Sequence, residues 1–167
     1  MKMSMYQASL PVFIHMLKNL DAILAKGAAH AEAKGIDPEV LVMARLYPDM
    51  FPLARQVQIA TDVVKGCPAR LAGQEPPKFE DNETSFGELS ERVEKTIAFL
   101  QTFKPEQIDG TEDKQVTLHM RSGDLTLEGY SYLTGFVIPN FFFHVTTAYN
   151  ILRHNGVELG KMDFIGA

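Results

Sequence analysis

The chain has 167 residues, of which 46% are hydrophobic and 22% are charged, a composition typical of an ordered globular protein. The formal net charge of −5 and the scattered lysines and arginines argue against nucleic acid as a direct partner. No apolar run approaches the ~18 residues of a membrane span, and polar residues interrupt the N-terminal region before a secretory signal could form. The single cysteine, Cys67, excludes an intramolecular disulfide and a thiolate-rich metal site. We therefore expect one cytoplasmic domain over residues 1–167, with no membrane partner.

Three helices are predicted in the first part of the chain. Apolar residues recur at three- and four-residue steps over residues 4–27, which is typical of an amphipathic helix, and an Ala-rich continuation ends at Gly35. Residues 37–44 begin with an Asp-Pro pair, the N-cap and first turn of a short helix. The next helix is predicted over residues 52–65, and Gln56 lies on its inward flank. Four other polar residues of this helix form a stripe expected to face solvent: Arg55, Gln58, Asp62 and Lys65.

The middle of the chain contains a long connection, a helix and a hairpin. Residues 66–84 are rich in proline and glycine and are expected to form a broken helix end and a surface connection over one end of the protein. Residues 85–88 are a capping box that starts a helix, which ends before Pro105. The hydrophobic period changes to alternation over residues 115–127, which predicts a small β-hairpin. Residues 130–137 fit either a short helix or an extended segment that leads into the next helix.

The most apolar helix is predicted from Pro139 to about Asn155. It carries two adjacent apolar stripes, so we expect it to be buried on most sides. His144 lies within the second stripe, and its imidazole is therefore expected to point into the protein. Four apolar stripes and a single change of period together predict an all-α fold, an antiparallel four-helix bundle with a small β-hairpin before the last helix.

His144 is the best candidate for a catalytic residue or a metal ligand. No second histidine lies three or four residues away, and His154 is about 15 Å further along the helix. A metal would have to be gathered from other helices, with His15 and Gln56 as sources, although glutamine is a poor zinc ligand. A core histidine that is hydrogen-bonded to a neighbour is the favoured interpretation.

Two further residues of the last helix complete the predicted pocket, together with Gln56 and His144. Tyr149 is either a core residue whose hydroxyl reaches a partner or a proton donor that faces a pocket. Arg153 either binds an anion or complements the negative end of the helix dipole. The chain contains no Gly-rich phosphate loop, nucleophile elbow or zinc-protease helix.

Three segments carry a resemblance to a known family. They are the stretch PNFFFHVTTAYNILRHNGVELGKMDF at residues 139–164, the sequence ARLAG at residues 69–73 and the capped third long helix. With them the chain resembles an uncharacterised domain family within the DinB/YfiT-like superfamily. The resemblance implies a DinB-like four-helix bundle that is often a homodimer.

The resemblance also implies a site. Many members of the superfamily bind a divalent metal through one histidine of the second helix and a His-x-x-x-His pair on the last, and some are thiol-dependent transferases or isomerases. His144 matches the first histidine of the pair, whereas the matching partner position is Ala148 and the second-helix position is Gln56. We therefore expect a small-ligand-binding protein with a degraded metal site and little affinity for Zn or Ni. The alternatives are a metal- or thiol-dependent transferase or isomerase that uses His144, and a structural dimerisation module.

Overall fold

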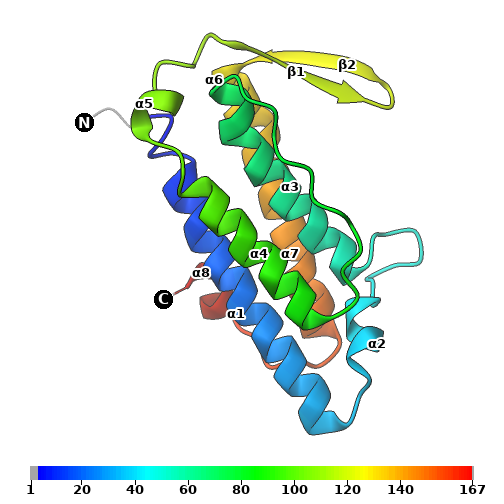
Figure 1. Ribbon diagram of the computed structural model, residues 1–167. Coiled ribbons are helices and arrows are strands. Elements are labelled where there is room, and N and C mark those ends of the chain that lie inside the picture. Colours follow the sequence, from blue (N-terminus) through cyan, green and yellow to red (C-terminus); the bar gives the residue numbers. More distant parts are fainter. Residues whose placement is uncertain (1–3, 167) are drawn as a thin grey trace.

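The computed structural model describes residues 4–166, which form long helices, short helices and one β-hairpin (Figure 1). The long helices are α1 (Leu10–Lys34), α3 (Leu53–Leu71), α4 (Phe86–Leu100) and α7 (Ile138–His154). The short ones are α2 (Pro38–Val42), α5 (Pro105–Ile108), α6 (Gly129–Ser131), the π-helix η1 (Tyr132–Val137) and α8 (Lys161–Ile165). The strands are β1 (Gln115–Met120) and β2 (Gly123–Glu128). The predicted mainly helical fold, with a hairpin before the last long helix, is confirmed.

The long helices lie side by side (Figure 1), with α3 against α4 and α7, and α1 against the same two helices. Gln56 contacts His144 and Arg70 contacts Tyr132, so α3 runs antiparallel to η1 and α7. The helices α1 and α4 are antiparallel as well. In contrast, α3 and α4 run in the same direction, because the connection formed by residues 72–85 returns along them (Figure 1). The antiparallel arrangement expected from the sequence therefore does not describe every neighbouring pair.

The apolar stripes of the long helices meet in one core. Phe13 of α1 and Phe141 of α7 are fully buried and pack edge to face, with ring centroids 5.4 Å apart. Burial of a side chain of this kind contributes about 1.5–3 kcal/mol to folding. Other fully buried members of the core are Leu17, Leu20, Leu53, Val57, Val64, Leu89, Val93 and Val145. None of the helices between residues 4 and 166 is long and apolar enough to cross a membrane.

Two helix starts have the predicted caps. The Ser85 Oγ accepts a hydrogen bond from the backbone N–H of Glu88 at 3.2 Å, and a Glu88 carboxylate oxygen accepts one from the Ser85 N–H at 3.0 Å. At α2, the Asp37 carboxylate accepts from the backbone N–H of Glu39 at 3.0 Å. These bonds satisfy backbone donors that have no partner inside the helix.

The hairpin lies across the end of the protein where α3 ends and α7 begins (Figure 1). Its strands are antiparallel, with Leu118 opposite Leu125, and Leu118 is buried against the helices. Residues 130–137, for which the sequence left two interpretations, are helical: one turn of α6 continues into η1, which runs directly into α7. Such π-helical turns occur frequently at functional sites. The C-terminal tail packs against α1, since Asn19 of α1 donates a hydrogen bond to the Phe164 carbonyl at 3.0 Å.

The predicted end of α3 is wrong. Residues 66–71, expected to form a broken helix end after residue 65, continue the helix. Gly66 and Pro68 are both poor helix formers, and proline cannot donate a backbone hydrogen bond. However, this last stretch of α3 is almost completely buried, with Cys67 and Leu71 fully so. Burial of the segment therefore overrides its low helix propensity.

The stripe of α3 that was expected to face solvent is partly covered. Gln58 is 5% exposed and donates a hydrogen bond to Glu83 at 2.9 Å. Lys65 is 4% exposed, and its ammonium lies 3.7 Å from the centroid of the Phe79 ring. The cause is the connection formed by residues 72–85, which folds over this face of α3 instead of covering only one end of the protein.

Candidate functional site

A buried polar pair joins α3 and α7. His144 lies in the middle of α7 and is 8% exposed, and Gln56 lies in the first turn of α3 and is 2% exposed. The His144 Nδ1 and the Gln56 Oε1 are 2.6 Å apart. The two polar side chains that the sequence placed on inward-facing positions therefore meet across one helix interface.

The Gln56 amide determines which imidazole nitrogen carries the proton. The Gln56 Nε2 donates a hydrogen bond to the backbone carbonyl of Phe51 at 3.0 Å, which turns Oε1 towards His144. A carbonyl oxygen can only accept, so Nδ1 of His144 is the donor. In a neutral imidazole the other nitrogen, Nε2, then carries a lone pair and acts as an acceptor.

The lone pair of the His144 Nε2 is available to a hydrogen-bond donor from outside the protein. Within residues 4–166 the His144 Nε2 has no hydrogen-bond partner, whereas no fully buried side-chain nitrogen or oxygen in this range lacks one. It follows that Nε2 is reached by solvent. The site therefore presents a hydrogen-bond acceptor whose direction is fixed by the protein.

The imidazole is neutral at physiological pH. Burial, followed by the positive charge of Arg55, lowers the pKa of His144 from 6.5 to about 4. A histidine with this pKa is almost uncharged at pH 7 and is a weak base. The neutral imidazole of His144 is therefore better suited to accept a hydrogen bond than to take up a proton.

Two exposed aromatic residues contact the pair, Phe143 through its ring and Phe51 through its backbone carbonyl. The Phe143 ring meets the His144 imidazole edge to face, with centroids 5.1 Å apart, and is 57% exposed. The backbone carbonyl of Phe51 accepts the hydrogen bond of the Gln56 amide. The exposed ring of Phe51 lies 5.9 Å from the guanidinium carbon of Arg55. The site thus combines one acceptor, one cation and two apolar surfaces.

The other residues predicted to share this pocket lie elsewhere. Tyr149 packs edge to face against Phe164 of α8, with centroids 6.2 Å apart. The five residue steps from His144 to Tyr149 rotate the side chain by about 140° around the helix. Arg153 is exposed in the last turn of α7. The structure brings Gln56 and His144 together, and it adds Arg55 to them, but it does not bring Tyr149 or Arg153 to the same place.

The donors around His144 do not fit a tightly bound transition metal. Zinc sites use three or four histidine, cysteine or carboxylate ligands, and the described part of the chain has no group of three such residues placed to hold a metal. The position four residues after His144 is the fully buried Ala148, and the Gln56 Oε1 is already bonded to the imidazole. His15 is bonded to the backbone carbonyl of Ile165, at 2.7 Å. A metal at His144 would have one imidazole nitrogen and otherwise water.

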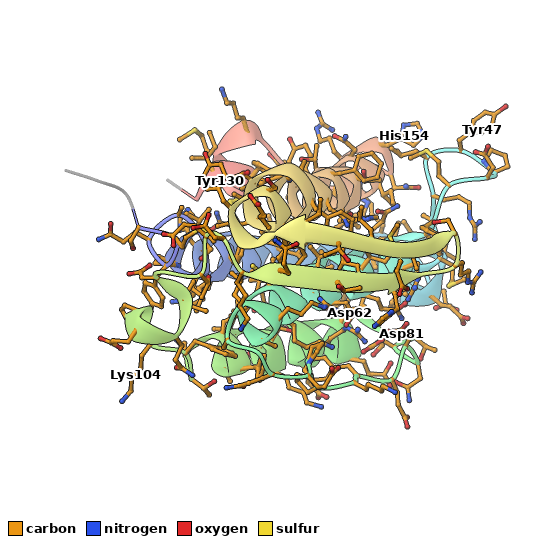
Figure 2. The ribbon with its side chains drawn as sticks, turned by 90° about the horizontal axis from the view of Figure 1, so that it is seen from above. Tyr47, Asp62, Asp81, Lys104, Tyr130 and His154 are labelled. Carbon is orange, nitrogen blue, oxygen red and sulfur yellow. The ribbon has the colours of Figure 1, made fainter. Side chains whose placement is uncertain are left out.

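A second polar cluster, which the sequence analysis missed, lies between α3, α4 and the connection. Its centre is Arg92 of α4, which is 3% exposed. Its guanidinium donates four hydrogen bonds at 2.8–3.0 Å, to the Thr61 hydroxyl, the Glu80 carbonyl and the carboxylates of Asp62 and Glu83. The Nη2 also makes an ion-pair contact with an Asp81 oxygen at 3.1 Å. Figure 2 shows Asp62 and Asp81 close together. Arg92 lies three residues after Leu89, on the apolar face of its helix, and that spacing could have revealed a buried cation.

The fold is that of a DinB-like helical protein. The crystal structure of a DinB family member protein from Shewanella denitrificans is similar to this chain, with a TM-score of 0.91 and 44% sequence identity. The similarity covers 97% of this chain and 92% of that chain. The family described as "Domain of unknown function (DUF1993)" matches residues 5–165, and the chain belongs to this family. The comparison with curated proteins gave no match. The resemblance identified on residues 139–164 is thereby confirmed.

Proposed function

We propose that this protein binds a small organic molecule at His144 and does so without a tightly held metal. The observation that carries the proposal is the open Nε2 of a neutral imidazole whose tautomer is fixed by Gln56. We infer that the site belongs to a DinB-type four-helix bundle, in which α3 and α7 form the ligand-facing pair.

The geometry selects a class of ligand. The Nε2 requires a hydrogen-bond donor, such as a hydroxyl, an amine or a thiol. The exposed rings of Phe51 and Phe143 favour an apolar or aromatic group next to that donor. A molecule with both features would satisfy the open acceptor and cover apolar surface at the same time.

Catalysis by His144 is the less favoured function. A general base works best when its pKa is close to the working pH, and the pKa of His144 is about 4. The protein's own thiol does not supply a nucleophile either, because Cys67 is fully buried and burial raises its pKa far above neutrality. The observations thus support binding more than a thiol-dependent transfer or isomerisation.

Ligand-observed NMR with a library of small alcohols, amines and thiols that carry an aromatic ring tests the proposal. Molecules that bind the wild-type protein should lose about five- to tenfold in affinity with His144→Ala, since a hydrogen bond is worth about 1–1.5 kcal/mol. The matched control is His154→Ala, which removes an exposed histidine from the same helix and should change nothing. Binding that survives His144→Ala would disprove a site at His144.

Self-association is a separate proposal. We propose a homodimer, as the resemblance implies, and the exposed large apolar side chains of Val40, Met43 and Tyr47 are consistent with a protein surface that meets a partner. Light scattering after size-exclusion chromatography should give twice the chain mass of 18.6 kDa. A monomer that still binds ligands at His144 would remove the dimerisation module as an alternative function.

A further inference from the structure

A pocket of about 240 Å³ lies between the hairpin, α3 and η1. Its walls include three apolar side chains, Val63 of α3, Leu118 of β1 and Phe136 of η1. Its polar lining includes Arg70 and Tyr132. The pocket is therefore amphipathic, with hydrogen-bonding groups beside an apolar compartment.

This pocket is close to the His144 site but separate from it. Asn140 borders the pocket and lies one helical turn before His144, about 6 Å along α7. None of the residues discussed for the His144 site lines the pocket. An inference about this pocket consequently does not rest on the function proposed for His144.

The donors in the pocket lack an acceptor. The Arg70 Nη1 donates to the Tyr132 hydroxyl at 3.1 Å, which is the single hydrogen bond of this guanidinium within residues 4–166. A guanidinium has five N–H donors, so most of them are unused. The Tyr132 oxygen accepts from Arg70, which leaves the tyrosine proton free to be donated. Burial raises the pKa of Tyr132 to about 12, so the hydroxyl keeps this proton at neutral pH.

The charge of Arg70 is not balanced by the protein over the described range. Every ion pair there uses other residues. The carboxylate of Asp62 borders the pocket, but its Oδ1 accepts from Lys65 and Arg92, each at 2.8 Å. His119, also at the pocket, is paired with Asp124 of the hairpin at 2.8 Å. Arg70 is therefore the one arginine or lysine that lines the pocket, and it has no carboxylate within ion-pair distance in the described range.

The backbone of α3 makes room for this guanidinium. Gly66 lies one helical turn before Arg70, and a Cβ at this position would overlap the Arg70 Nη1. Glycine inside a helix is destabilising relative to alanine. The less stable glycine thus occurs where the Arg70 guanidinium lies against the helix. A side chain at residue 66 would displace the guanidinium.

We propose that this pocket binds a small carboxylate with an apolar or aromatic body. The carboxylate accepts hydrogen bonds from Arg70 and Tyr132, and the body fills the compartment formed by Val63, Leu118 and Phe136. A carboxylate matches the guanidinium in both charge and planar geometry. An inorganic anion would leave the apolar walls in contact with water, so the organic acid is the better fit.

The first test compares phenylacetate with phenylacetamide on the wild-type protein by isothermal titration calorimetry or NMR. The two probes have nearly the same shape and differ in charge. We expect phenylacetate to bind at least tenfold more tightly, because hydrogen bonds to charged groups are about twice as strong as neutral ones. Equal binding of the two probes, or no binding of phenylacetate at millimolar concentration, would overturn the proposal.

Variants then locate the site. Arg70→Gln should weaken phenylacetate binding at least tenfold, whereas Arg121→Gln, which removes the same charge from the exposed hairpin turn, should leave it within about twofold. Gly66→Ala retains the charge but displaces the guanidinium, so it should weaken binding several-fold while the far-UV spectrum stays unchanged. His144→Ala should have no effect on phenylacetate. Equal losses with Arg70→Gln and Arg121→Gln, or loss with His144→Ala alone, would show that phenylacetate does not bind in this pocket.

Discussion

Helix α3 takes part in two buried polar clusters that differ in how many of their hydrogen bonds are made within the protein. At the Arg92 cluster, each of the three guanidinium nitrogens donates at least one hydrogen bond within the protein. At the His144 site, the Nδ1 is bonded to Gln56 and the Nε2 has no partner within residues 4–166. Buried polar groups are normally satisfied, because an unused donor or acceptor in a low dielectric is costly.

The difference separates a structural role from a binding role. The Arg92 cluster fixes the connection of residues 72–85 against α3 and α4, and its charges are compensated within the protein. The His144 site fixes one nitrogen of an imidazole and leaves the other available to a molecule from outside. Changes at Arg92 should therefore affect stability, and changes at His144 should affect ligand binding and the response to pH.

The largest expected effect is that of Arg92→Met. The substitution removes the common partner of Asp62, Asp81 and Glu83. Within residues 4–166, Asp62 then keeps only Lys65 and Asp81 keeps only Arg55 as ion-pair partners. Removing one partner of a buried ion pair costs roughly 3–5 kcal/mol of folding free energy. Because Asp62 and Asp81 are 39% and 37% exposed, we expect the lower end of that range, about 3 kcal/mol. Urea denaturation measures this difference.

A matched control exists for this substitution. Arg121→Met removes an exposed arginine and should change the free energy of unfolding by less than about 0.5 kcal/mol. Similar losses in the free energy of unfolding for the two variants would mean that the Arg92 cluster does not stabilise the fold. Ligand binding at His144 should be the same in both.

The second effect is a dependence of stability on pH. The pKa of His144 is about 4 in the folded protein, below the ordinary value of 6.5. The unfolded chain therefore binds a proton at His144 more readily than the folded protein does. The contribution of the neutral His144 to the free energy of unfolding is complete above pH 6.5 and is lost as the pH falls towards 4. The loss amounts to roughly 2 kcal/mol at pH 5.

The measurement is the free energy of unfolding between pH 7 and pH 5 for the wild-type protein and for His144→Gln. The variant has no ionisable group at this position, so its stability should fall less steeply. Parallel curves for the two proteins would contradict a neutral, buried His144.

The smallest expected effect is that of added metal. One imidazole nitrogen leaves most of a coordination shell to water, so protein purified without added metal should carry well under one equivalent of any transition metal. Excess Zn²⁺ or Ni²⁺ should shift the melting temperature little, because stabilisation follows the ratio of metal concentration to dissociation constant. Elemental analysis after dialysis is the direct check. Stoichiometric metal that is lost in His144→Ala would show that a further ligand completes the site.

The sequence predicted those parts of the fold that depend on local periodicity and capping. The inward positions of Gln56 and His144, the capping box of residues 85–88 and the hairpin all follow from patterns within a few residues. The contact between Gln56 and His144 could only be suggested, since the relative rotation of α3 and α7 is set by the whole core. The same limit explains why Tyr149 was grouped with His144.

Features that depend on distant segments were not predictable. Lys65 and Gln58 look solvent-facing in the sequence, and only the course of residues 72–85 covers them. The extension of α3 past Pro68 rests on burial by other elements, and the π-helix η1 has no periodic pattern of its own. Arg70 was overlooked because its partner Tyr132 is 62 residues away, and because the helix that places Gly66 against Arg70 was expected to end before both residues.

The tautomer of His144 tests the central claim most directly, because the proposed function depends on an open Nε2. Two-dimensional ¹H–¹⁵N NMR of the imidazoles at pH 7, with His144→Gln to assign the signal, distinguishes the two neutral forms and the imidazolium. We predict a protonated Nδ1 and an unprotonated Nε2 whose ¹⁵N shift changes when a ligand with a hydroxyl, amine or thiol donor binds. A proton on Nε2, or a charged imidazolium at pH 7, would contradict the account.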